Sequence, residues 1–78
     1  MTDQQITEAC RKHGAKGVSD AAYAAMDGRP AAILALGLGD LRNLGDLHRA
    51  TSIAYGLMGD DDRAADMTQA TIRAAGLP

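Results

Sequence analysis

The residues best suited to metal chemistry in this 78-residue chain are its single cysteine and its two histidines. Cys10 and His13 stand three residues apart, a spacing that can place two ligands on one face of a helix. A zinc site needs two further ligands, and only His48 and scattered aspartates remain to supply them. We therefore predict no metal site. Cys10 is expected to be a small buried side chain, and His13 a favourable group at a helix C-terminus.

Nucleophilic catalysis also has candidate residues. Ser19, Ser52 and Cys10 could attack a substrate, with His13 or His48 as the base. Cys10 and His13 are close neighbours on one helix, which is a poor geometry for an oriented triad, and no oxyanion-binding element accompanies them. Ser19 is better suited to capping a helix. The sequence therefore predicts a protein that is not an enzyme, with no catalytic residue and no cofactor.

The segment "GLGDLRNLG" raises the question of phosphate binding, because it contains Gly37, Gly39 and Gly45. A dinucleotide fingerprint would require Gly where Arg42 stands, and the chain has no GK[ST] sequence. The same region holds a tandem hexad, LGDLRN at 38–43 and LGDLHR at 44–49. A solenoid needs at least three repeats. We expect instead that in each copy Gly closes one segment, Asp caps the next, and Leu enters the core.

Four aspartates, Asp60, Asp61, Asp62 and Asp66, form the densest charge cluster. They lack the register, the sixth-position Gly and the terminal Glu of an EF-hand loop. Asp60 as an N-cap, followed by acids in the first turn, is the ordinary explanation. The alternative is that these four residues form an acidic patch that binds a partner.

Capping and turn residues predict where the helices begin and end. Thr2 and Gln5 make a capping box for a helix from near Asp3, which Gly14 would close. A connector "AKGV" (15–18) would follow, and Ser19 would then cap a second helix ending at Gly28.

The second half of the chain is divided in the same way. Pro30 would open an apolar third helix, "PAAILALG", which we expect to be central. Asp46 would open a fourth helix that ends at Gly59, and a last helix after Asp60 would end at Gly76. The predicted fold is all-α, a compact bundle of about five short helices in a single domain, 1–78.

The expected core is built without Phe or Trp, and the only aromatic residues are Tyr23 and Tyr55. Its bulk must come from Ile6, Val18, Met26, Ile33, Leu34, Leu36, Leu38, Leu41, Leu44, Leu47, Ile53, Leu57, Met58, Met67, Ile72 and Leu77. In the fourth helix, Leu47, Ala50, Ile53, Ala54, Leu57 and Met58 share one face at helical spacing. We assign Met26, Met58 and Met67 to the core rather than to a binding groove.

Charge and compartment signals point to a protein partner. The net charge is −2 with neutral histidines, which argues against free nucleic-acid binding and for a partner that is itself basic. The start of the chain lacks a secretory signal pattern, and no apolar run reaches the roughly 20 residues that span a bilayer. We expect a cytoplasmic protein that is not inserted in a membrane.

Residues 6–28, "ITEACRKHGAKGVSDAAYAAMDG", resemble the helix-turn-helix segments of repressors and transposases, with Ala9 in the first helix and Gly14 and Gly17 in the turn. The connector "HGAKG" is longer than the usual tight turn. The would-be recognition helix, 19–27, carries two aspartates and no Lys, Arg, Asn or Gln for base readout. Residues that could hold phosphates are Arg11, Lys12, Lys16 and Arg29. The missing base-reading side chains argue against sequence-specific DNA binding, and the four basic residues leave a DNA-binding regulator as an alternative.

A short, acidic, Ala-rich helical chain without catalytic residues is also similar in type to small proteins of phages and mobile elements, such as anti-CRISPR inhibitors of type I surveillance complexes. This resemblance implies a non-enzymatic inhibitor that binds a host protein complex. Its acidic face, Asp60, Asp61, Asp62 and Asp66, would cover a basic groove and block target DNA binding. The second alternative is a small assembly protein that forms a homodimer through exposed Leu and Met side chains.

Overall fold

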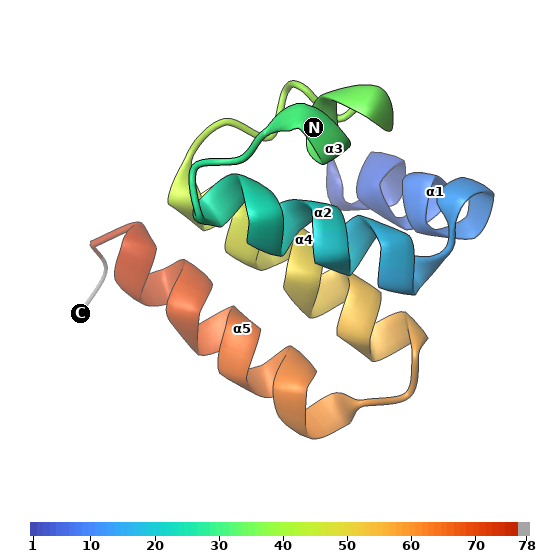
Figure 1. Cartoon of the computed structure of the whole chain (residues 1–78). Coiled ribbons are helices and arrows are strands. Elements are labelled where there is room, and N and C mark those ends of the chain that lie inside the picture. Colours follow the sequence, from blue (N-terminus) through green and yellow to red (C-terminus); the bar gives the residue numbers. More distant parts are fainter. Residues whose placement is uncertain (77–78) are drawn as a thin grey trace.

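The chain is helical along most of its length. The computed structural model describes residues 1–76, in which it has five helices and no strand. They are α1 (Asp3–His13), α2 (Ala15–Met26), α3 (Ala31–Ala35), α4 (Leu44–Leu57) and α5 (Asp61–Ala74) (Figure 1). Helix α4 packs against α1, α2 and α5, and α2 packs against α1, α3 and α4. The predicted all-α bundle of about five short helices is confirmed. No helix within residues 1–76 has the length and apolar character needed to cross a membrane.

Helix α1 follows its sequence signals closely. The Thr2 hydroxyl accepts from the Gln5 N–H (3.2 Å), and the Gln5 side chain accepts from the Thr2 N–H (2.8 Å). This reciprocal capping box confirms the predicted start. Gly14 ends the helix at φ +88°, a backbone conformation that side chains disfavour. The start of the chain is also fixed to α4, because Arg49 donates to the Met1 carbonyl at 2.6 Å.

The prediction for the next segment was wrong. "AKGV" is not a connector, because α2 begins at Ala15, directly after Gly14. Ser19 does not cap the helix: it lies in its second turn and is buried, with 2% of its surface exposed. The single residue Gly14 serves as the C-cap of α1 and the N-cap of α2. The five-residue turn expected for "HGAKG" is therefore reduced to one residue.

Helix α3 is short and peripheral, and its expected central position was wrong. It spans five residues, of which only Ile33 is buried. Pro30 is the N-cap of α3 and not its first helical residue, so the helix begins one residue later than predicted. Leu34 is 59% exposed, the highest value among the large apolar side chains of residues 1–76. An apolar run without periodicity does not specify which face of the helix will be packed. In α3 only the side that carries Ile33 packs against the rest of the protein.

The tandem hexad divides between a loop and a helix. In the first copy, Leu38 and Leu41 lie in the α3–α4 loop and are buried, as predicted. The second copy lies inside α4, so Asp46 is not the cap. Asn43 caps α4 by accepting from the Asp46 N–H at 2.8 Å. The expectation that Gly and Asp separate the elements therefore fails for the second copy.

The core lies between α1, α2, α3 and α4. Its buried members are small or branched: Ile6, Cys10, Val18, Ala21, Ala22, Ile33, Leu38, Leu41, Leu47, Ala50 and Ala54. Small side chains allow α1, α2 and α4 to pack closely without any Phe or Trp. Four expected core residues are instead exposed: Leu34, Leu44, Leu57 and Met58. Met26, Leu36, Ile53, Met67 and Ile72 are half-buried, and Leu77 lies outside the described residues.

Helix α5 begins as predicted and packs differently from the rest. Asp60 caps it by accepting from the Arg63 N–H at 3.2 Å. None of its residues is buried. It lies along the outer side of α4 (Figure 1). The Ser52 hydroxyl of α4 donates to the Ala64 carbonyl (2.9 Å) and lies 2.8 Å from the Thr68 hydroxyl. The contact between α4 and α5 therefore includes side-chain hydrogen bonds beside its half-buried apolar side chains, Met67 and Ile72.

Candidate interaction surface

The predicted acidic residues gather where α5 begins. The Asp60 carboxylate is already bound within α5. It caps the helix by accepting from the Arg63 N–H, and it lies 3.5 Å from the Arg63 Nε. Asp61 and Asp62 lie in the first turn, where carboxylates interact favourably with the positive end of the helix dipole. Asp66 follows Asp62 by one helical turn. Asp61, Asp62 and Asp66 therefore take no part in capping α5.

These three carboxylates project into solvent. Asp61, Asp62 and Asp66 are exposed, and none of them forms an ion pair with a cation in residues 1–76. Met58, which is 42% exposed, lines an open hollow of about 450 Å³ together with Asp61 and Asp62. We name Met58, Asp61, Asp62 and Asp66 the acidic edge. It combines three negative charges with one flexible apolar side chain, a composition suited to a basic, partly apolar protein surface.

A second cluster, which the sequence reasoning missed, lies at the junction of α2, α4 and α5. The Tyr55 hydroxyl donates to the Tyr23 hydroxyl (3.1 Å), which in turn donates to the Met67 sulfur (3.8 Å). The two rings meet edge to face, with centroids 6.3 Å apart at 61°. The Arg63 guanidinium lies 5.6 Å from the centre of the Tyr55 ring. This tyrosine cluster (Tyr23, Tyr55, Arg63 and Met67) fixes the start of α5, and hence the acidic edge, against the core.

The hydroxyl pair also changes the acidity of both tyrosines. When Tyr55 ionises, hydrogen bonds from Tyr23 first and Ser19 second stabilise the tyrosinate, which lowers the Tyr55 pKa. Tyr23 is then the group that must keep its proton for that bond. Its pKa rises to about 12, through this hydrogen bond first and burial second. The only sequence signal for the cluster is that these are the two aromatic residues of the chain.

The residues considered for metal binding and catalysis are scattered. Cys10 is buried in α1, where desolvation raises the pKa of its thiol, whereas His13 is exposed at the end of the same helix. His48 is half-buried on α4, and its Nδ1 has no hydrogen-bond partner in the described chain. Ser52 is engaged by α5. Across residues 1–76, no three His, Cys, Asp or Glu side chains are grouped as a metal site would require.

The residues considered for DNA binding are partly neutralised. Lys16 pairs with Asp20 on α2 at 3.0 Å, and Arg29 pairs with Asp27 at 3.1 Å. Arg11 and Lys12 remain exposed at the end of α1. The one-residue link at Gly14 also differs from the turn of a helix-turn-helix unit, which is typically three or four residues long.

In comparisons with known proteins, no family model, curated protein or solved structure matches this chain.

Proposed function

We propose that this protein is a non-enzymatic interaction module whose acidic edge binds a basic surface of another protein. The observation that carries the proposal is the set of exposed carboxylates, Asp61, Asp62 and Asp66, that form no ion pair in residues 1–76. Asp61 and Asp62 line one hollow together with exposed Met58. Charges arranged in this way steer association and select partners of opposite charge.

A basic groove that binds nucleic acid is the partner surface that fits best. Such a groove presents Lys and Arg side chains that normally neutralise phosphates. An acidic helix end can occupy the same cations and exclude the nucleic acid. This is the mechanism implied by the resemblance to small anti-CRISPR inhibitors, and it makes the protein an inhibitor of a host nucleic-acid-binding complex.

The test uses two charge-matched variants. The edge variant carries D61N, D62N and D66N, and leaves Asp60 to cap α5. The control variant carries D3N, E8Q and D27N, which removes the same number of exposed carboxylates from α1 and from the end of α2. Each protein is immobilised and used to capture host proteins, and captured complexes are assayed for nucleic-acid binding.

We expect wild type and the control variant to capture the same basic complex and to block its nucleic acid. The edge variant should bind at least about tenfold more weakly, since three rim charges are lost. Equal capture by both variants would contradict the acidic-edge mechanism. A shift of random duplex DNA by the isolated protein at low salt would favour the DNA-binding alternative instead.

A further inference from the structure

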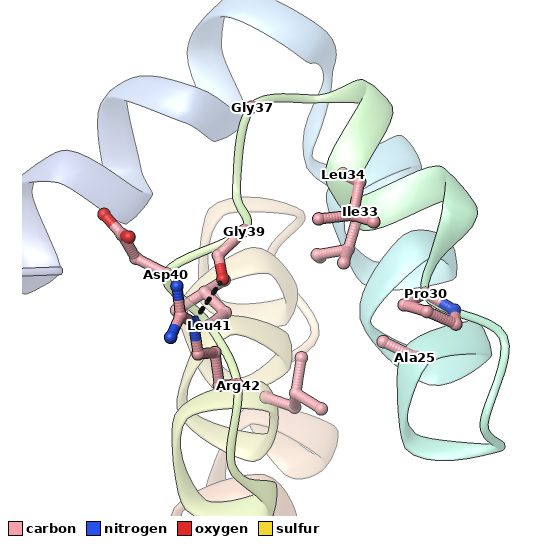
Figure 2. A pocket seen from close by; sticks show the side chains of 10 residues that line it. Ala25, Pro30, Ile33, Leu34, Gly37, Gly39, Asp40, Leu41 and Arg42 are labelled. Carbon is pink, nitrogen blue, oxygen red and sulfur yellow. Dashed lines mark hydrogen bonds between the residues drawn. The ribbon is translucent and has the colours of Figure 1, made fainter.

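A hollow of about 470 Å³ lies between α3, the end of α2 and the α3–α4 loop (Figure 2). Its bottom is apolar, formed by buried Ile33, Leu41 and Leu47. Leu34 stands on the α3 wall and is 59% exposed. One surface region therefore holds an apolar hollow and, on its wall, an exposed leucine whose side chain lies against Gly39 of the same copy.

The opposite wall of the hollow is thin and carries two opposite charges. Gly37 and Gly39 leave the loop without side chains there, and a Cβ on Gly39 would come within 3.1 Å of Leu34. Asp40 and Arg42 leave the outer side of the same loop close to each other (Figure 2). Neither forms an ion pair in residues 1–76, and Arg42 donates only to the Gly39 carbonyl at 3.3 Å.

We propose that this region is a homodimer interface, in which Leu34 of each copy turns away from its own Gly39 and enters the hollow of the other. A two-fold axis brings every residue of the patch opposite the partner's patch, so a surface that holds both a projection and a hollow complements itself. The same axis lets Asp40 of one copy pair with Arg42 of the other, twice. The patch has no net charge, whereas two copies of the acidic edge would repel each other.

The expected dimer is weak. Ten residues line the hollow, fewer than the roughly 20–30 per side of a standard stable interface. We therefore expect a dissociation constant of about 100 μM. Figure 1 shows α3 and the turn between α4 and α5 at opposite ends of the molecule. Dimerisation through α3 would thus leave both acidic edges free, and it does not depend on the function proposed above.

Sedimentation velocity of the full chain up to about 1 mM tests the interface. Wild type should shift from 8.1 kDa toward twice that mass as its concentration rises. L34E should remain monomeric throughout, while the control L57E, which alters another exposed leucine, should dimerise like wild type. Circular dichroism should show the same helix content in every variant, because both leucines are exposed.

The charge pair gives an independent readout. D40R and R42D should each raise the dissociation constant about tenfold, and the double variant D40R/R42D should return to within about threefold of wild type. The edge variant D61N/D62N/D66N should dimerise normally. A monomeric wild type at about 1 mM, loss of dimer in L57E, failure of the double variant to recover, or growth beyond a dimer would each overturn the proposal.

Discussion

The body formed by α1–α4 and the outer helix α5 are built on different principles. The body closes around side chains such as Ile6, Val18 and Ala54, each with 0% of its surface exposed. Helix α5 buries no residue completely and is attached through Ser52, the tyrosine cluster and half-buried Met67 and Ile72. The difference separates two tasks, because the apolar body carries the stability while α5 carries the acidic edge. Substitutions on α5 can therefore alter the surface at little cost to the fold.

The largest expected effect compares one substitution in the two regions. Ile6→Ala removes a fully buried side chain from the body and should lower the free energy of unfolding by about 2–5 kcal/mol. Ile72→Ala makes the same change on half-buried α5 and should cost about 1 kcal/mol. Urea denaturation followed by circular dichroism measures both. Equal losses would show that α5 is an integral part of the core, and the comparison would fail.

Hydrogen exchange should show the same division without any substitution. Helix α5 has no fully buried side chain, so opening it exposes less apolar surface than opening α2 or α4, which carry several. We expect amides in the middle of α5 to exchange at least about tenfold faster than those in the middle of α4, a difference of about 1.4 kcal/mol or more in opening free energy. Native-state exchange followed by NMR measures this. Matching protection along both helices would indicate that they open together.

The two regions also differ in how much of them the sequence predicts. Helix ends at Thr2, Gly14, Gly59 and Asp60 depend on local capping and backbone chemistry, and these were predicted. The position of Ser19 was not, because a residue typical of caps is tolerated inside a helix once tertiary packing covers it. The prediction that Leu34 belongs to the core failed for a related reason, since an apolar run does not reveal which of its faces is packed.

The tyrosine cluster lay beyond sequence reasoning because it is made across long separations. Tyr23 meets Tyr55 across 32 positions and Met67 across 44. No local period or spacing records such contacts, whereas the acidic residues at the start of α5 follow one another in the chain and could be identified as a group. Their three-dimensional support, through Arg63 and Tyr55, appears only in the folded molecule.

A smaller effect tests the polar joint between the regions. Ser52→Ala removes the hydroxyl that donates to the Ala64 carbonyl and contacts Thr68. The loss of about 1 kcal/mol in unfolding free energy should come with faster exchange in α5 than in wild type. Thr68→Ala and the double variant complete a cycle, with an expected coupling of about 0.5–1 kcal/mol. Additive losses would show that the two hydroxyls act independently.

The smallest effect concerns the tyrosines that join α2, α4 and α5. The chain has no Trp and two Tyr, so absorbance near 295 nm follows their ionisation directly. Tyr55 should titrate below its ordinary value of 10.0, and Tyr23 only near 12. Stability that Tyr23 contributes is complete below pH 10 and is lost as the pH rises toward 12, because the unfolded chain releases this proton first. Tyr55 acts in the opposite direction, so spectroscopy resolves the pair better than unfolding does.

In Tyr23→Phe the Tyr55 pKa should move upward, since the main donor to its tyrosinate is gone. A single transition at pH 10 in wild type would mean that the hydroxyls do not interact and that α5 lacks this attachment to the body.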